Sequence, residues 1–199
     1  MAMPSLTDLP LADAPFAALD FEGAGAAKGM SDEAVQVGIA SADGLAEERV
    51  ALFTSYIRPR QEVAWTATRV HGIDAARVEG APFLEELWPD LRERLGGRVI
   101  VAHGAATEKR FLRRLPMHGF GPWVDTLRLA RMVFPKARSH RLGDLIRAAG
   151  LEGQLTALFP EGERKWHDAL FDAAACLVLL RHLVAASARG ADARVGDLM

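Results

Sequence analysis

The sequence is poor in cysteine and has no long apolar run. Cys176 is the single cysteine among 199 residues, which excludes an internal disulfide and a cysteine-based zinc site. Its apolar neighbours favour a small core residue over a reactive thiol. The longest apolar run, residues 173–180, is too short to cross a bilayer, and the N-terminus lacks a basic region followed by a long apolar run. We therefore expect a cytoplasmic protein with no membrane partner.

An excess of basic residues is also absent. Lysine and arginine number 24 against 26 aspartates and glutamates, for a formal net charge of -2. Bulk electrostatics therefore does not indicate nucleic-acid binding, which would have to come from local patches. The glycine- and alanine-rich residues 23–29 lack the P-loop arrangement of strand, phosphate loop and helix. Half of the residues are apolar and a quarter are charged, which is ordinary for a globular protein.

Hydrophobic patterning predicts an α/β chain that opens with three consecutive strands. The predicted strands lie at about 16–22, 35–40, 49–57, 99–102 and within 119–124. The predicted helices lie at about 82–95, after 103, and at 126–134, 142–149 and 168–186. Asp125, Ser139 and Asp168 are expected N-caps, and residues 151–165 are expected to form a loop. We expect one domain over 1–199, with an N-terminal arm (1–14), a core (15–188) and a frayed tail (189–199).

Residues 16–23, Phe-Ala-Ala-Leu-Asp-Phe-Glu-Gly, place two carboxylates at the end of a buried strand. Asp20 and Glu22 are two residues apart, so both project from the same face of that strand. Two buried anions side by side are costly without partners, and a divalent cation would neutralise them. Oxygen ligands alone suit Mg²⁺ or Mn²⁺ better than Zn²⁺. The alternative is a strand that runs out into a loop, with both acids in water.

Two further groups of acids and imidazoles stand at element boundaries. His103 follows the fourth strand and Glu108 lies on the helix after it, while His167 and Asp172 stand at the head of the last helix. Sites in α/β sheets assemble where the carboxyl ends of neighbouring strands meet, so we expect the acids to converge there. Acids from three elements would hold two metals, which clamp an in-line phosphoryl displacement. By itself, Glu108 also fits a solvated charge on a helix face.

These residues, in this order, resemble the motifs of the DEDDh 3′–5′ exonucleases, the superfamily of the proofreading subunit of bacterial DNA polymerase III, ribonuclease T and oligoribonuclease. The matching segments are 20–23 (Asp-Phe-Glu-Gly), 103–112 (His-Gly-Ala-Ala-Thr-Glu-Lys-Arg-Phe-Leu) and 167–173 (His-Asp-Ala-Leu-Phe-Asp-Ala). A histidine five residues before the last aspartate points to the h branch. The resemblance covers about residues 16–184. It implies a ribonuclease H-like fold, a mixed five-stranded sheet flanked by helices.

The resemblance also implies an activity and a role for each motif residue. The activity is release of nucleoside 5′-monophosphates from the 3′ ends of single-stranded DNA or RNA, with two Mg²⁺ or Mn²⁺ ions. Asp20 would bridge both ions, Glu22 and Asp172 would complete one site, and the acid of the second motif, here Glu108, would hold the other ion. His167 would be the general base, a task suited to an imidazole. Four neighbouring positions are expected to contact the substrate: Phe21, Gly23, His103 and Gly104. The resemblance also implies that the protein associates as a homodimer or with a polymerase.

Three positions depart from the family's motifs. Gly23 stands where the family has threonine, Gly104 where it has asparagine, and Glu108 where it has aspartate. Glutamate keeps the charge but is one methylene longer, and such sites need sub-ångström placement. The departures leave a second hypothesis open, a catalytically impaired module on the same fold that binds nucleic acid or protein. His71 and His140 are expected to be ordinary hydrogen-bonded histidines. Basic residues that could hold phosphates, or form a solvated face, are Arg58, Arg60, Lys109, Arg110, Arg113 and Arg114.

Overall fold

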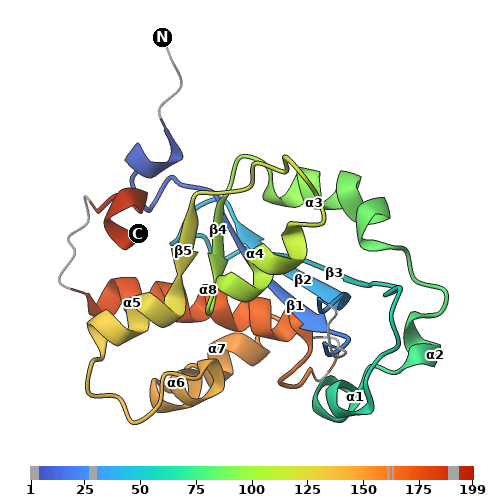
Figure 1. Cartoon of the computed structure of the whole chain (residues 1–199). Coiled ribbons are helices and arrows are strands. Elements are labelled where there is room, and N and C mark those ends of the chain that lie inside the picture. The colour runs from blue at the N-terminus through green and yellow to red at the C-terminus, as the bar shows by residue number, and fades with distance from the viewer. Residues whose placement is uncertain (1–4, 27–30, 161, 163, 188–192) are drawn as a thin grey trace.

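The protein is built on a mixed five-stranded sheet with the strand order β3-β2-β1-β4-β5 (Figure 1). Its computed structural model describes residues 5–26, 31–160, 162, 164–187 and 193–199. β1 pairs antiparallel with β2 and parallel with β4, while β2–β3 is antiparallel and β4–β5 parallel. The predicted fold class is confirmed. The strands are β1 (Phe16–Gly23), β2 (Ala34–Ala42), β3 (Ala51–Tyr56), β4 (Val99–Ala102) and β5 (Trp123–Asp125).

Helices cover both faces of the sheet (Figure 1). The α-helices are α1 (Trp65–His71), α2 (Ala75–Val78), α3 (Trp88–Leu95), α4 (Ala106–Leu112), α5 (Thr126–Val133), α6 (Leu142–Ala148), α7 (Glu152–Thr156) and α8 (Ala169–Ala186). Short 3-10 helices are η1 (Leu6–Asp8), η2 (Leu84–Leu87) and η3 (Val195–Leu198).

Alternation along β1 decides which side chain faces which layer of helices. Phe16 and Ala18 lie in a core that includes residues of α5, α6, α7 and α8, whereas Leu19 lies in a second core with residues of α3 and α4. Asp20 and Glu22 continue the series of Phe16 and Ala18. The side chains of the two acids therefore project from the face of β1 that α8 covers, just beyond the apolar part of the strand.

α8 is the central helix of the first core, and it packs on β1 and β2. By length and composition it could also cross a membrane, but 67% of it is buried inside the protein. The predicted helix at 168–186 is confirmed, and it is longer than the uninterrupted apolar run at 173–180. Packing on several sides accounts for its composition, because a helix that is apolar all round belongs in a core.

The helix starts test the expected caps. The carboxylates of Asp125 and Asp168 each accept two backbone hydrogen bonds from the first turns of α5 and α8, so both predicted N-caps are confirmed. The prediction for Ser139 is wrong. Arg141 immediately precedes α6 without a side-chain cap. The Ser139 hydroxyl accepts from the Arg141 N–H at 3.2 Å and bonds the Asp144 side chain, so it caps no backbone N–H of the helix.

The segment 151–165, expected to be a loop, contains α7. Leu151 is 5% exposed and Leu155 is 1% exposed. These leucines are four residues apart, so they lie on the same face of a helix and belong to the core around α8. Tertiary burial therefore forms a helix that its own sequence would not hold, as is usual for short helices.

The two ends of the chain pack on each other. The N–H of Leu11 donates to the carbonyl of Ala193 at 3.0 Å, and the N–H of Val195 donates to the carbonyl of Leu9 at 3.1 Å. Val195 is 0% exposed and lies in the core around α8. The expected fraying is therefore wrong for residues 193–199, while residues 189–192 lie outside the described part of the chain.

Candidate active site

β1 and β2 together place the first pair of acids. In the β1–β2 ladder Asp20 lies opposite Gly38, and Glu22 lies opposite Gln36. Side chains of directly opposed residues share a face of the sheet, so all four positions face α8. The acids are half-buried, which excludes the alternative of a strand end running freely into water.

The loop before α8 brings His167 and Asp172 to the same place. The His167 N–H donates to Oδ2 of Asp172 at 3.2 Å. Glu22, His167 and Asp172 each offer a ligand atom, and these atoms lie within 4.8 Å of one another. His167 is exposed and has a φ of 66°, which is uncommon outside glycine. Such strain persists only where the surroundings impose it, and it concentrates at functional sites.

Glu108, in the first turn of α4, completes the group of acids. Its side chain is 4% exposed, so it is no solvated charge on a helix face. Burial raises the pKa of Asp20 well above its usual range, and the charges of Asp172, Glu108 and Glu22 raise it further. Carboxylates from β1, α4 and α8 thus surround Asp20. The structure brings the four predicted acids together, while their roles stay predictions.

Burial is also the main cause of the raised pKa values of the other three acids. It raises the pKa of Glu22 to about 8, that of Glu108 to about 7 and that of Asp172 to about 7. Neighbouring acids add to each shift, because like charges disfavour ionisation. Carboxylates in such a cluster are stable as anions once a cation shares the site.

Two carboxylate oxygens of this cluster are buried without a hydrogen-bond partner among the described residues. They are Oε2 of Glu108 and Oδ1 of Asp172. Buried polar atoms are nearly always satisfied, and an orphan costs free energy. Coordination of cations would satisfy each of these oxygens. Since Mg²⁺ and Mn²⁺ prefer oxygen ligands, the donor set fits the divalent ions that the motifs imply.

A family model described as an exonuclease, RNase_T, matches residues 17–180. The chain belongs to this exonuclease family. The matched range contains the four acids and His167, and it agrees with the extent of the DEDDh resemblance.

Curated relatives carry DNA polymerase III names. The chain is 33% identical over 193 residues to a DNA polymerase III subunit epsilon-like protein of Rhodobacter capsulatus, a match that covers 94% of this chain and 26% of the relative. It is 31% identical over 149 residues to a PolC-type DNA polymerase III of Thermotoga maritima, covering 72% of this chain and 11% of the relative. The chain thus spans about a quarter and about a tenth of these relatives.

Solved exonucleases share the fold. Exonuclease X in complex with 5′ overhanging duplex DNA has a TM-score of 0.70 at 23% identity, covering 92% of this chain and 98% of its own. The nuclease domain of 3′hExo, a DEDDh family member bound to rAMP, has a TM-score of 0.66 at 17% identity, covering 87% and 92%. Both likenesses confirm the ribonuclease H-like fold. The activity class, exonuclease, rests on the family match.

The side chain of Phe21 lies in the core of this exonuclease fold. Phe21 is 5% exposed, and its ring centroid is 5.4 Å from that of Phe111. Because it alternates with Asp20 and Glu22 along β1, it faces the layer of α3 and α4. Its side chain is therefore a core side chain, and substrate contact by Phe21 stays a prediction.

Another side chain occupies the space that a residue larger than glycine would need at Gly23. A Cβ on Gly23 would lie 2.5 Å from Oδ2 of Asp32. The Asp32 carboxylate accepts from the Gly25 N–H at 2.9 Å and lies 3.7 Å from Arg110. The sequence motifs do not identify Asp32, because no local pattern links it to the end of β1. The family's threonine at this position would therefore require the Asp32 carboxylate to move.

His103 and Gly104 brace the start of α4. The His103 ring nitrogens lie 3.0 Å from the Thr126 hydroxyl and 2.8 Å from the carbonyl of His140, so the ring is committed to structural bonds. Gly104 has a φ of 89°, and its N–H donates to Oδ1 of Asp125 at 3.0 Å. Asp125 thus ties the β4–α4 turn to α5. Substrate contact by these two residues stays a prediction.

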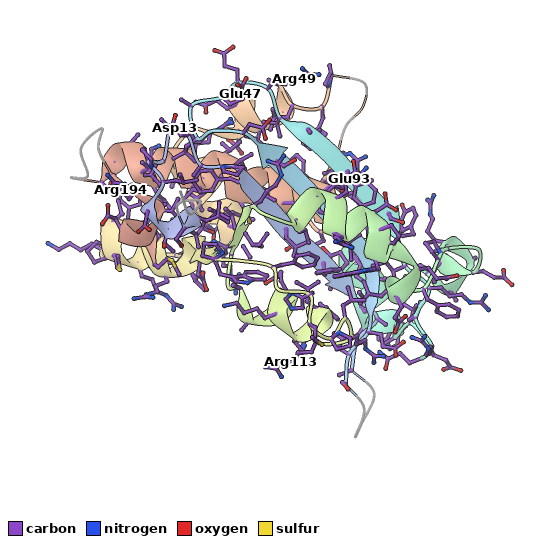
Figure 2. The ribbon with its side chains drawn as sticks, turned by 90° about the horizontal axis from the view of Figure 1, so that it is seen from above. Asp13, Glu47, Arg49, Glu93, Arg113 and Arg194 are labelled. Atoms are coloured by element: carbon purple, nitrogen blue, oxygen red, sulfur yellow. The ribbon has the colours of Figure 1, made fainter. Side chains whose placement is uncertain are left out.

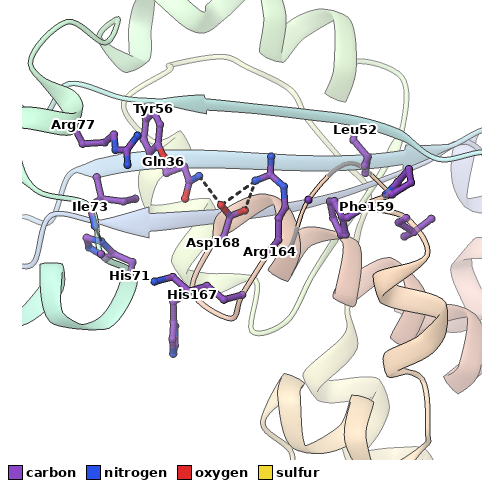
Figure 3. Close-up of a pocket in the computed structure, with 15 residues that line it drawn as sticks. Gln36, Leu52, Tyr56, His71, Ile73, Arg77, Phe159, Arg164, His167 and Asp168 are labelled. Carbon is purple, nitrogen blue, oxygen red and sulfur yellow. Dashed lines mark hydrogen bonds and ion pairs between the residues drawn. The ribbon is translucent and has the colours of Figure 1, made fainter.

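A cavity of about 760 Å³ opens beside His167 (Figure 3). Residues of β2 and β3 line one side of it, and Phe159, Arg164 and His167 line the other. Asp168, on its wall, is ion-paired with Arg164 at 2.9 Å and caps α8. Asp168 is therefore the expected cap, with its oxygens engaged, whereas Oδ1 of Asp172 has no partner among the described residues.

Most of the basic residues singled out have partners. Arg113 is exposed at the end of α4 and extends into solvent (Figure 2). Lys109 and Arg58 lie over aromatic rings. Ion pairs join Arg60, Arg110 and Arg114 to Glu85, Asp32 and Glu33, respectively. These contacts make the group a partly neutralised face rather than a continuous phosphate-binding strip.

The remaining histidine and cysteine expectations are confirmed. His71 Nδ1 accepts from the Ile73 N–H at 3.0 Å, so its Nε2 donates to the carbonyl of Gly23 at 3.1 Å. The Nε2 of His140 bonds a backbone carbonyl at 3.0 Å. Cys176 is 0% exposed, and burial raises the pKa of its thiol, so it is a core residue.

Proposed function

We propose that this chain is a metal-dependent 3′–5′ exonuclease that hydrolyses phosphodiester bonds at the 3′ ends of single-stranded DNA or RNA. The observation that carries the proposal is the meeting of four carboxylates and His167 at one end of the sheet, with two buried oxygens unpartnered among the described residues. Membership of the exonuclease family supports it. The product would be a nucleoside 5′-monophosphate.

The four acids are the proposed ligands of two Mg²⁺ or Mn²⁺ ions. Asp20, with the other acids around it, would contact both ions. Glu22 and Asp172 would complete one site, and Glu108 would serve the other. Ions bound in this way stabilise the negative charge that develops on a phosphate under attack. Glu108 is suited to its role because it is buried and keeps one oxygen free of protein partners.

His167 is the proposed general base. Its exposed ring stands beside Asp172, and its backbone is fixed by the bond to that carboxylate. The imidazole would take a proton from the attacking water. Attack in line with the leaving group breaks the bond to the 3′ oxygen of the preceding nucleotide, and the phosphate stays on the released one. General-base help of this kind is worth about 10²–10⁴-fold in rate.

Gly23 and Gly104 are the proposed substrate contacts at the end of β1 and in the β4–α4 turn. A Cβ on Gly104 would meet only a Leu127 methyl at 3.7 Å, so its backbone is accessible from one side. Small residues let a ligand approach the main chain closely. His103 supports this turn from behind, through its own hydrogen bonds.

The proposed setting is cytoplasmic, with a polymerase or a second copy of this chain as partner. A polymerase partner is supported by the names of the relatives, in which the matched region is a small part. No membrane partner is proposed, because most of the apolar helix α8 is buried in the core.

Product analysis tests this function. Purified protein, a single-stranded oligonucleotide and Mn²⁺ should give nucleoside 5′-monophosphates on anion-exchange chromatography. EDTA, or Asp20→Asn, should abolish them. Nucleoside 3′-monophosphates, or products that persist in EDTA, would contradict the proposal.

A further inference from the structure

Gln36 is a buried polar residue that the motif reading passed over. It lies in β2 opposite Glu22, and it is 3% exposed. Its carboxamide reaches from the sheet to the start of α8. Oε1 accepts from the Ala169 N–H at 3.1 Å, and Nε2 donates to Oδ2 of Asp168 at 3.4 Å. Nε2 also donates to the Thr54 hydroxyl at 3.4 Å.

The chemistry of these partners fixes the orientation of the amide. A backbone N–H can only donate, so the carbonyl oxygen must face Ala169. A carboxylate can only accept, so the NH₂ group must face Asp168. Figure 3 shows Gln36 and Asp168 joined in this way, with Arg164 on the other side of the carboxylate. Both donors of the Gln36 amide are therefore used within the protein, and the residue offers no free donor to a ligand.

Gly38, two residues further along the same face, provides the second contact with α8. A Cβ on Gly38 would lie 2.2 Å from backbone atoms of Ala169 and Leu170, so α8 rests directly on the β2 backbone. Gly38 is the partner of Asp20 in the ladder, as Gln36 is the partner of Glu22. The two β2 residues that hold the start of α8 are thus the cross-strand neighbours of the two β1 acids.

We infer that Gln36 is a positioning residue that sets the distance between the β1 acids and the α8 acid. Asp172 lies in the first turn of α8, and its N–H donates to the carbonyl of Asp168 at 3.0 Å. Any shift of the residues that Gln36 holds is therefore passed to the carboxylate. This inference rests on the proposed function, because the acids are taken as ligands of Mg²⁺ or Mn²⁺.

Mn²⁺ affinity, measured by isothermal titration calorimetry, tests the inference without requiring turnover. Gln36→Ala should weaken Mn²⁺ binding by about tenfold or more, the usual loss when a group that orients metal ligands is removed. It should lower kcat more than it raises KM. Thr54→Val removes one partner of the same amide without touching α8, and it should bind Mn²⁺ as the wild type does.

A charge exchange separates positioning from folding. Gln36→Glu places a carboxylate against that of Asp168 and should weaken Mn²⁺ binding. Adding Asp168→Asn restores a donor opposite the new acceptor and keeps a good helix cap, so the double variant should recover Mn²⁺ affinity. Asp168→Asn alone controls for the loss of the ion pair to Arg164.

The outcomes distinguish a failure of the proposed function from a failure of the inference about Gln36. If the wild type binds no Mn²⁺, the proposed function fails. If the wild type binds Mn²⁺ and degrades oligonucleotides, but Gln36→Ala and Gln36→Glu lower only the melting temperature and keep wild-type Mn²⁺ affinity, Gln36 is a purely structural residue and the inference is wrong.

Discussion

The backbone N–H of His167 donates to Oδ2 of Asp172 at 3.2 Å. This bond joins the loop before α8 to the first turn of the helix, and it holds the candidate base beside a candidate metal ligand. The other oxygen, Oδ1, is buried without a partner among the described residues. The same carboxylate therefore holds the loop with one oxygen and leaves the other without a partner among the described residues, as the proposed metal site requires.

Asp172→Asn separates these two uses. Asparagine keeps an oxygen that can accept the His167 N–H, but it has no charge for a cation. We expect an unchanged circular dichroism spectrum together with the loss of Mn²⁺ binding in calorimetry. Mn²⁺ affinity within twofold of the wild type would show that Asp172 is not a ligand.

His167→Ala should leave Mn²⁺ affinity nearly unchanged and lower kcat by about 10²–10⁴-fold, the range of general-base contributions. A ring nitrogen of His167 also lies within 4.8 Å of carboxylate oxygens of Glu22 and Asp172, so the three could share an ion. Metal binding must therefore be measured alongside the rate. If Mn²⁺ affinity falls as steeply as kcat, His167 is a ligand and the base lies elsewhere.

The acids could be found from the sequence because their signals are local. Asp20 and Glu22 follow the period of a strand, and the spacing of His167 and Asp172 is a motif in itself. The contacts of Gln36 and Asp32 could not be found in this way. Each joins segments that are distant along the chain, and a lone glutamine or aspartate has many uses.

The predictions for short elements and for the chain ends failed for a related reason. α7 and η3 are too brief to carry a periodic pattern, and both are held by burial of residues such as Leu155 and Val195. The cap of α6 was misassigned because a serine near a helix start is a cap only when its hydroxyl accepts from a backbone N–H of the first turn. Ser139 instead bonds the N–H of Arg141, before the helix, and the side chain of Asp144.

Gly23→Thr, which restores the family's residue, should impair this protein. Its Cβ would lie 2.5 Å from Oδ2 of Asp32, and overpacking of this kind costs about 1–3 kcal/mol. Asp32→Ala removes the obstacle, so the double variant should be less destabilised than the sum of the two single variants. Urea denaturation of the four proteins gives the coupling. Simple additivity would show that Asp32 does not set the choice of glycine at position 23.

Glu108→Asp tests whether the longer side chain is part of this site. The α4 backbone holds a glutamate whose carboxylate reaches the acidic cluster, so an aspartate would stop one methylene short. Misplacement by about 1 Å can cost about 10²-fold in rate. We expect a fall in kcat that Mn²⁺ only partly relieves. An equal or higher kcat would mean that the helix position suits aspartate as it does in the family.

The raised pKa values predict how the metal-free protein responds to pH. The pKa values of Glu22, Glu108 and Asp172 are raised from 4.5, 4.5 and 3.8 to about 8, about 7 and about 7. The folded state then binds more protons than the unfolded state between about pH 4 and pH 8, so stability falls as pH rises through that window. In EDTA the melting temperature should be lower at pH 8 than at pH 5, and Mn²⁺ should raise it more at pH 8. A melting temperature in EDTA that rises over this range would contradict the burial of the acids.

The most direct test of the central claim is a time course on 5′-labelled single-stranded DNA and RNA oligonucleotides with Mn²⁺, with Mg²⁺ and with EDTA, beside Asp20→Asn. The account predicts a ladder that shortens from the 3′ end, requires the metal and is absent in the variant. The sugar that is degraded faster identifies the preferred nucleic acid. If folded wild-type protein shortens neither oligonucleotide with either metal, the cluster around Asp20 is not an exonuclease site and the account is wrong.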